Sequence, residues 1–281
     1  MSGLARSDRI ADRFAALKAV NRAALIAFVT AGDPDEETAR GILSALPRAG
    51  ADIVELGMPF SDPVADGPAI QLASERALAG GGSLRKTLAM VRDFRSDDRE
   101  TPVVLMGYFN PIYSYGAETF ASDAAAAGVD GLIIVDLPPE EEDDLRPDAE
   151  AAGLHLIRLV TPTTDEARLE TILKNAGGFV YYVAVAGITG GRTAGIEELS
   201  AALATVRRHT RLPLAVGFGI KTPEQAAAVA QVADAAVVGS AIVERIAGGL
   251  RDDGSAGPDL VDGVADCVGA LAAAVHNARG G

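Results

Sequence analysis

The sequence contains no tryptophan, one cysteine and three histidines among its 281 residues. The single cysteine, Cys267, cannot form a disulfide within the chain, so cysteine usage indicates a reduced, cytoplasmic protein. The histidines His155, His209 and His276 lie far apart, and neither HExxH nor CxxC spacing occurs. Because metal ligands usually come at such spacings, we expect no metal site.

Charge and hydropathy disfavour two further classes of function. The 25 Lys and Arg against 39 Asp and Glu give a formal net charge of -14, which repels nucleic-acid phosphates and anionic lipid. The most apolar long stretch, residues 226–243, is interrupted by Gln231 and Asp234 and makes a poor membrane span. Residues 1–14 carry Arg and Asp and lack the apolar core of a signal peptide. We therefore expect a protein that binds neither nucleic acid nor membrane.

Short aliphatic and β-branched runs recur eight times along the chain. They show little polar alternation, which is typical of strands buried on both faces of a parallel sheet. Ala-rich segments with helical periodicity lie between them, and no linker divides the chain. This alternation predicts an α/β fold, one (β/α)8 TIM barrel over residues 1–281, with a doubly wound open sheet as the alternative. The predicted strands are residues 24–30, 52–56, 103–106, 131–135, 155–160, 179–184, 214–218 and 235–238, and the predicted helices include 36–49, 84–94, 117–127, 165–175, 196–209 and 223–232.

Local signals predict where helices begin and which connections are long. Residues 33–36 and 222–225 each offer an N-cap, a Pro at the first helical position and an acid or amide at the third. An extra amphipathic helix over residues 6–20 is expected to cover the bottom of the barrel. The longest connections, 57–83 and 187–195, follow the second and sixth strands, where a barrel builds its active site.

A carboxylate interrupts the second predicted strand near its C-terminal end. With period two, Ile53, Glu55 and Gly57 share one face of the strand. If that face is the barrel interior, desolvation raises the pKa of Glu55 and makes it a usable acid and base near neutral pH. The alternative is a buried, salt-bridged structural Glu.

The following loop, residues 60–68, carries two acids between Pro and Gly residues. Asp62 or Asp66 could pair with Glu55 so that their protons move separately, whereas a solvated loop carboxylate is the ordinary state of either one. Sequence spacing does not decide which of the two faces a substrate.

Glycine-bearing turns follow the seventh and eighth predicted strands, at residues 217–219 and 239–241. Backbone N–H groups in such turns and a helix N-terminus bind anions, and barrels commonly hold phosphate after these two strands. The alternative is that tight turns simply need glycine. GxGxxG is absent, so a dinucleotide fingerprint is not present. Residues 187–195 are expected to form either a mobile lid or a plain flexible loop.

Nucleophilic catalysis is poorly supported. GxSxG is absent, and no lysine falls inside a predicted strand, where a Schiff-base aldolase would hold it desolvated. The residues therefore favour acid–base carbon–carbon chemistry without a covalent intermediate. The acidic run 140–144 is interpreted as a solvated helix start, where negative charge suits the helix dipole. The four lysines are Lys18, Lys86, Lys174 and Lys221.

Six segments, in order and over nearly the whole chain, closely resemble one family, the α subunit of tryptophan synthase. The long second segment is the most specific, because other phosphate-binding barrels lack it. The chain departs from the usual pattern at Ala184, where relatives often carry Ser, and at Ile188, where Val is common; the loss of a hydroxyl at 184 would bear on how the sixth loop docks. The matching segments are residues 28–34 (FVTAGDP), 54–68 (VELGMPFSDPVADGP), 105–111 (LMGYFNP), 186–190 (AGITG), 217–220 (GFGI) and 239–243 (GSAIV).

The resemblance implies a (β/α)8 barrel that cleaves indole-3-glycerol phosphate to indole and glyceraldehyde 3-phosphate in tryptophan biosynthesis. It implies that Glu55 is the general acid–base, that Asp66 rather than Asp62 holds the indole N–H, and that Tyr181 lies near Glu55. The remaining residues that it implies are Phe28, Ile70 and Met106 in the indole pocket, Thr189 in the closing loop, and Gly190, Phe218, Gly219, Gly239 and Ser240 at the phosphate.

The resemblance also implies a partner, because members usually form an αββα heterotetramer with a β subunit that holds pyridoxal phosphate. Residues 59–63 and 110–111 are similar to the surfaces that face this partner, and this chain is expected to need no cofactor of its own. The alternatives are a stand-alone lyase that releases indole and a catalytically silent barrel that only activates a β subunit. A chain that helps to make tryptophan and contains none could still be translated when tryptophan is scarce; chance absence is the alternative explanation.

Overall fold

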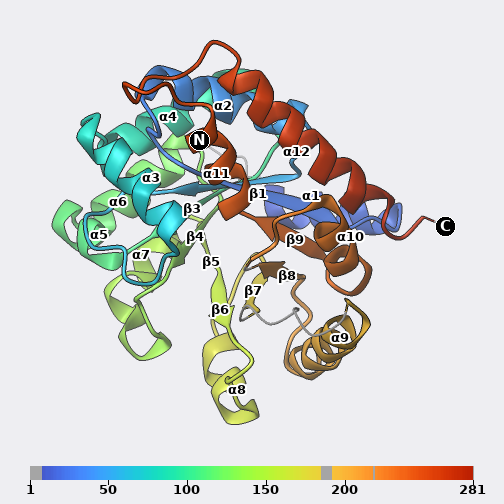
Figure 1. The fold of residues 1–281 in the computed structure, drawn as a ribbon. Coiled ribbons are helices and arrows are strands. Elements are labelled where there is room, and N and C mark those ends of the chain that lie inside the picture. Colours follow the sequence, from blue (N-terminus) through green and yellow to red (C-terminus); the bar gives the residue numbers. More distant parts are fainter. Residues whose placement is uncertain (1–7, 185–191, 218, 281) are drawn as a thin grey trace.

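The computed structural model describes residues 8–184, 192–217 and 219–280, and its core is a parallel sheet surrounded by helices (Figure 1). Each strand pair is parallel, and the strand order is β5-β4-β3-β2-β1-β9-β8-β7-β6. This order confirms the predicted barrel over the open doubly wound sheet. The strands are β1 (Ala24–Thr30), β2 (Ile53–Gly57), β3 (Val103–Gly107), β4 (Gly131–Ile134), β5 (His155–Leu156), β6 (Arg158–Val160), β7 (Val180–Val183), β8 (Leu214–Gly217) and β9 (Ala235–Val238).

The fifth predicted strand, 155–160, is divided into β5 and β6 at Ile157. Its first part pairs with β4 and its second part pairs with β7, so a single stretch of chain connects the two edges of the sheet. The backbone N–H of Ile157 still donates to Leu132 O of β4 at 2.9 Å. The barrel is therefore nearly closed at this point, and eight predicted strands correspond to nine observed ones.

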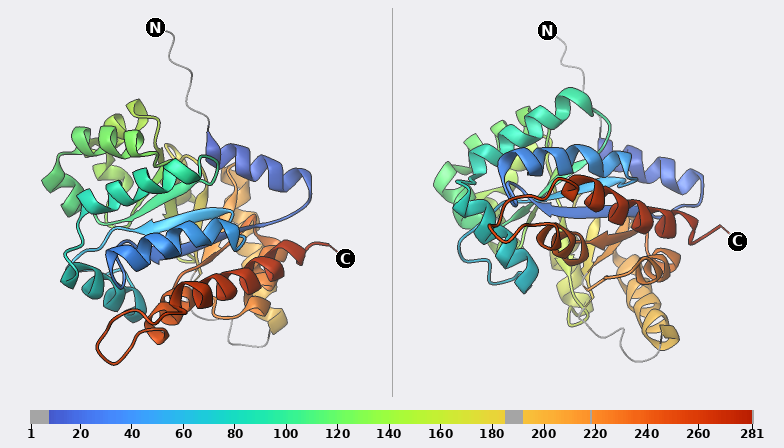
Figure 2. Two further views of the ribbon diagram at one scale, coloured as in Figure 1. Left: turned by 90° about the horizontal axis from the view of Figure 1, so that it is seen from above. Right: turned by 45° about the horizontal axis from the view of Figure 1, so that its top comes forward.

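Helices cover the outside of the sheet (Figure 2). The C-terminal helix α12 packs against α2, α10 and α11. None of the helices in the described ranges combines the length and hydropathy that crossing a membrane requires. The helices are α1 (Arg9–Ala19), α2 (Glu36–Arg48), α3 (Pro68–Ala79), α4 (Leu84–Asp97), α5 (Phe109–Tyr115), α6 (Ala117–Ala127), α7 (Arg146–Ala151), α8 (Glu166–Leu173), α9 (Arg192–His209), α10 (Pro223–Val232), α11 (Ser240–Gly248) and α12 (Leu260–Asn277), with a 3₁₀ helix, η1, over Pro139–Asp144.

The barrel interior has its own small apolar core, separate from the larger core between the sheet and the helices. Side chains from alternate strand positions, such as Ile26, Ile53 and Ile133, point inward and pack together. Helix α1 contributes Ile10, Phe14 and Leu17 to this interior core, and the Phe14 and Phe179 ring centroids are 5.9 Å apart. This packing confirms that the extra N-terminal helix covers the bottom of the barrel.

One of the two predicted helix starts is correct and the other is wrong. Thr222 caps α10 as predicted, with Pro223 at the first helical position and a reciprocal capping box with Gln225. Helix α2 instead begins at Glu36, and its N-cap is Asp35, whose side chain accepts from the Thr38 N–H. The predicted cap, Asp33, is buried and accepts two hydrogen bonds from Arg76, at 2.7 and 2.9 Å, so it ties α3 to the first loop.

Two other expectations need correction. The long connection 57–83 is not all loop, because residues 68–79 form α3 after Gly67, which provides no side-chain cap. The acidic run 140–144 lies in η1 with most of its side chains exposed, but Glu142 is only 5% exposed. Glu142 accepts a hydrogen bond from the buried guanidinium of Arg158 on β6. This acid therefore anchors η1 to the barrel rather than facing water.

Candidate active site

A cavity of about 530 Å³ opens at the C-terminal ends of the strands. Its walls are mostly apolar, and the polar part of its lining includes carboxyl groups and the glycine-bearing turns after β8 and β9. Such a mixture of apolar walls and a few polar groups is usual for small-molecule sites. The residues that line it include Phe28, Glu55, Ala65, Asp66, Ile70, Met106, Tyr181, Gly219, Ile220, Lys221, Gly239, Ser240 and Glu244.

Glu55 enters the cavity from the middle of β2. Its backbone lies in register with Phe28 of β1 and Val104 of β3, and the residue is 1% exposed. Ile53, two residues earlier on the same face, belongs to the interior core, so apolar side chains lie below the carboxyl. Atom Oε2 is buried and has no hydrogen-bond partner among the described residues. Burial first, and the negative charge of Asp66 second, raise the pKa of Glu55 to about 8.

Asp66 lines the same cavity from the loop between β2 and α3. Burial raises the pKa of Asp66 above its ordinary value, whereas the hydrogen bond from Tyr108 lowers it. The Tyr108 hydroxyl donates to Asp66 Oδ2 at 3.1 Å and accepts from the Ala65 N–H at 2.9 Å. Gln71 of α3 donates to the Asp66 carbonyl at 2.9 Å and so fixes the loop. Tyr108 and Gln71, which do not line the cavity, therefore fix the position of Asp66.

The other loop acid, Asp62, is exposed and does not line the cavity. It accepts a hydrogen bond from its neighbour, Ser61 Oγ, at 2.5 Å. Of the two acids that the spacing leaves open, the structure therefore brings only Asp66 to Glu55.

An apolar wall stands beside the acids. Phe28 and Ile70 form a small apolar cluster with Met106, which the sequence resemblance also assigns to this wall and which packs against the interior core as well. Gly57, at the end of β2, makes room for the ring, since a Cβ there would come within 2.7 Å of Phe28 Cζ. A flat aromatic group can therefore lie between this wall and the carboxyls.

Tyr181 lies on β7 and lines the same cavity as Glu55. Its hydroxyl lies against Gly217 of β8, where a Cβ would collide with it. Burial, followed by the charges of Glu55 and Asp66, holds the pKa of Tyr181 well above its ordinary value, so the phenol stays protonated. It can therefore donate a hydrogen bond but cannot serve as a base near neutral pH.

The glycine-bearing turns after β8 and β9 also line the cavity. Gly219 has φ +77, a backbone conformation that favours glycine, and Gly239 directly precedes Ser240, the first residue of α11. The first N–H groups of a helix have no partner within it and suit an anion. Three further residues that the sequence resemblance implies, Thr189, Gly190 and Phe218, lie outside the described residues.

Two charged cavity residues were not predicted from the sequence. Lys221 directly follows the Gly219-Ile220 turn, and Glu244 lies one helical turn after Ser240 on the same face of α11. The Lys221 Nζ lies 3.1 Å from Glu244 Oε1. The available signal was their spacing from the glycine turns, but spacing does not say where a long side chain points.

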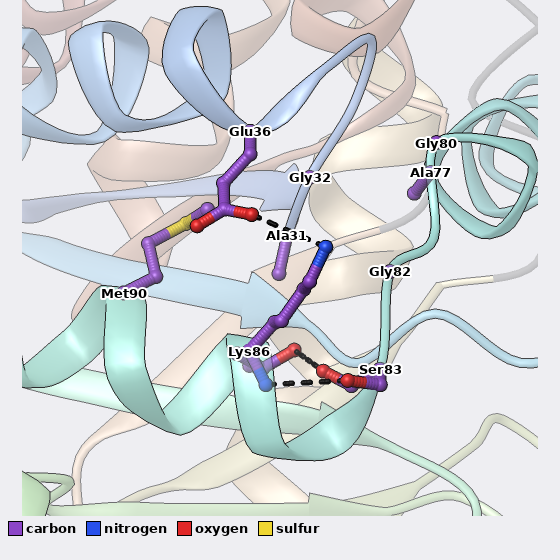
Figure 3. Close-up of a pocket in the computed structure, with 10 residues that line it drawn as sticks. Ala31, Gly32, Glu36, Ala77, Gly80, Gly82, Ser83, Lys86 and Met90 are labelled. Atoms are coloured by element: carbon purple, nitrogen blue, oxygen red, sulfur yellow. Dashed lines mark hydrogen bonds and ion pairs between the residues drawn. The ribbon is translucent and has the colours of Figure 1, made fainter.

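Two other cavities are lined by neither Glu55 nor Asp66. The one drawn in Figure 3, between α2, α3 and α4, has a volume of about 10 Å³, room for about one water. Its Lys86 pairs with Glu36 at 3.3 Å. A larger opening of about 840 Å³ lies at the bottom of the barrel beside Phe14, and neither Glu55 nor Asp66 lines it. Among the described residues, no group of three or more His, Cys, Asp or Glu could hold a metal ion.

The chain is similar to a known protein family in sequence and to several solved structures in fold. Residues 14–260 fit a family model described as tryptophan synthase alpha chain. A tryptophan synthase alpha chain from Legionella pneumophila is 41% identical with a TM-score of 0.87, over 97% of this chain and 98% of that one. A structure of Mycobacterium tuberculosis tryptophan synthase gives 36% identity and a TM-score of 0.84, over 96% and 99%. An Aquifex aeolicus structure gives 34% and 0.85, over 95% and 99%.

Proposed function

The chain belongs to the tryptophan synthase alpha chain family, and from this premise we propose that Glu55 and Asp66 carry out its reaction. The reaction is the lyase step of tryptophan biosynthesis that cleaves indole-3-glycerol phosphate to indole and glyceraldehyde 3-phosphate. One observation carries the assignment of roles. Glu55 is a buried carboxyl without a partner on Oε2, with a pKa of about 8, facing a second carboxyl in the same cavity.

The two acids suit different halves of the reaction. Protonated Glu55 gives its proton to the indole ring carbon that bears the glycerol chain, and positive charge then develops on the ring nitrogen. Asp66, which receives the hydrogen bond of Tyr108, accepts a hydrogen bond from the indole N–H and stabilises that charge. The Glu55 carboxylate then takes the proton of the glycerol hydroxyl. The carbon–carbon bond breaks, its electron pair returns to the ring, and indole and an aldehyde result.

The rest of the cavity positions the substrate. Phe28, Ile70 and Met106 form the wall for the indole ring, and the protonated Tyr181 lies beside Glu55. Gly219, Gly239 and Ser240 take the phosphate, and we extend the same role to Gly190 and Phe218 and loop closure to Thr189. No cofactor is required in this proposal, because the side chains named here supply each proton transfer.

The test is an indole-release assay on paired variants. Glu55→Gln and Asp66→Asn should each reduce turnover by about 100-fold or more, because each removes a group that acts in the transition state. Asp62→Asn is the matched control: it neutralises an exposed acid of the same loop and should keep wild-type turnover. Normal turnover in Glu55→Gln would overturn the assignment of the acid–base role.

We also propose that the chain assembles with a tryptophan synthase β subunit, as an αββα heterotetramer with pyridoxal phosphate in the partner, and that it works in the cytoplasm. Support comes from unusually exposed apolar side chains in the segments after β2 and β3, namely Val64 (85% exposed), Leu72 (53%) and Tyr113 (69%). Single-cysteine usage supports the location. Indole release measured with and without an added β subunit separates a partner-dependent subunit from a stand-alone lyase, and absence of turnover in the complex would indicate a silent barrel.

A further inference from the structure

The active-site cavity has an unfavourable charge for a phosphate ester. Among its described lining residues there are three acids, of which Glu55 is protonated in the neutral range whereas Asp66 and Glu244 carry negative charge in this proposal, and one cation, Lys221. The chain as a whole carries a net charge of -14. A phosphate dianion that enters this cavity meets repulsion, which glycine N–H groups and a helix N-terminus offset only in part. The position of the one cation therefore matters.

Lys221 is held where it can reach the phosphate end. Its backbone N–H donates to Gln225 Oε1 at 2.7 Å, and the capping box of Thr222 and Gln225 fixes the start of α10 directly after it. From there the side chain spans to α11, where Nζ lies 3.1 Å from Glu244 Oε1. Because Glu244 follows Ser240 by one helical turn, Lys221 reaches the helix face that begins at the expected phosphate-binding residue.

We propose that Lys221 is a specificity-determining residue that neutralises the substrate phosphate, and that Glu244 holds its ammonium until the phosphate replaces the carboxylate. This inference rests on the proposed function. The resting ion pair is easily exchanged, because its side chains are 58% and 50% exposed and exposed pairs contribute little stability. A phosphate dianion would also accept hydrogen bonds from the N–H groups of the glycine turns, whereas in the described part of the chain the Glu244 carboxylate accepts none from them.

The chain offers a matched control pair. Lys86 and Glu36 form an ion pair at 3.3 Å (Figure 3) and are similarly exposed, at 47% and 42%, but neither lines the active-site cavity. If Lys221 and Glu244 formed only an ordinary surface pair, breaking either pair would have the same effect on ligand binding. A difference between the two pairs therefore isolates the role of the cavity.

The test compares Lys221→Met, Lys221→Arg, Glu244→Gln and Lys86→Met by calorimetric binding of glycerol 3-phosphate, inorganic phosphate and indole. Lys221→Met should weaken the binding of both phosphates by about 10- to 100-fold, as expected for loss of one charged hydrogen bond. Lys221→Arg should restore most of that affinity, and Glu244→Gln should tighten phosphate binding by about two- to fivefold because the competing carboxylate is gone. Indole binding should stay at the wild-type level in each variant.

In turnover, Lys221→Met should raise KM for indole-3-glycerol phosphate more than it lowers kcat. Equal phosphate affinity in Lys221→Met and Lys86→Met would overturn the inference, as would weaker phosphate binding in Glu244→Gln. The binding assay needs no chemistry, so it can fail while Glu55→Gln still abolishes indole release. Conversely, the proposed roles of Glu55 and Asp66 can fail while phosphate affinity still depends on Lys221.

Discussion

At the residue scale, the most consequential group is the buried carboxyl of Glu55. Its pKa of about 8 means that it is protonated, and able to act as an acid, through the neutral range. Above about pH 8 the ionised form predominates, and we expect kcat/KM to fall about tenfold per pH unit. A pH profile of indole release measures this limb. A rate that stays level from about pH 7 to 9 would contradict an acid role for Glu55.

The acidic limb of the same profile belongs to Asp66, which must be ionised to stabilise positive charge on the ring nitrogen. The hydrogen bond from Tyr108 lowers the pKa of Asp66 against the effect of burial. Tyr108→Phe should therefore move the acidic limb to higher pH and leave the alkaline limb in place. Tyr115→Phe is the control, because its hydroxyl donates to Asp123 at 2.6 Å and does not line the cavity. A shift of both limbs in Tyr108→Phe would mean general loosening of the site.

These residues mark what the sequence could and could not reveal. The inward face of Glu55 follows from the period of two in a strand, because Ile53 is apolar and buried on the same side. The choice between Asp62 and Asp66 needed either the resemblance or the structure, since loops have no fixed period. The exposure predicted for Glu142 was wrong and the place of Lys221 in the cavity was not predicted, for one physical reason. A long charged side chain finds its partner through tertiary packing, which the sequence does not show. Lys221 pairs with Glu244, and Glu142 pairs with Arg158, so each partner lies many residues away along the chain.

At the scale of elements, continuous apolar runs predicted the strands well because both faces of a barrel strand are buried. The division at Ile157 was not predictable, since it arises from how the two edges of the sheet meet. Helices α3, α5 and α7 were not predicted. None of the three has a side-chain N-cap bond, and α5 is only seven residues long with Pro111 inside it, so packing rather than local signals fixes them.

Helix α1 is predicted to stabilise the barrel from below without taking part in the reaction. Phe14→Ala removes a ring that is 8% exposed and packed against Phe179, and should lower the free energy of unfolding by about 3 kcal/mol. Urea unfolding measures the change, and Lys18→Ala on the exposed face of α1 is the control. Activity per folded molecule should stay at the wild-type level. Loss of activity in fully folded Phe14→Ala would contradict this prediction, because it would show that helix α1 also affects the active site.

At the scale of the whole molecule, acidic composition and phosphate recognition are compatible because they act over different distances. The net charge of -14 repels polyanions, which present many phosphates at once. In the proposed site a single phosphate meets the turn at Gly219, the start of α11 and one nearby cation, Lys221, which all line the cavity. On the proposed function, charge at long range disfavours nucleic acid, whereas the cavity binds one small phosphate ester.

The exposed apolar side chains of the whole molecule allow a test of the proposed partner face. Val64 and Tyr113 belong to the segments after β2 and β3 at the catalytic end, whereas Val20, 62% exposed, ends α1 at the bottom of the barrel. If a β subunit covers the catalytic end, Val64→Ser and Tyr113→Ser should each weaken the complex by about tenfold, the effect of losing one buried apolar contact at an interface. Val20→Ser should leave the affinity unchanged, because a partner at the catalytic end does not reach it. Titration calorimetry with the β subunit measures all three. Equal losses at both ends would rule out docking at the catalytic end, whereas a loss confined to Val64 and Tyr113 would place the indole-releasing cavity next to the partner.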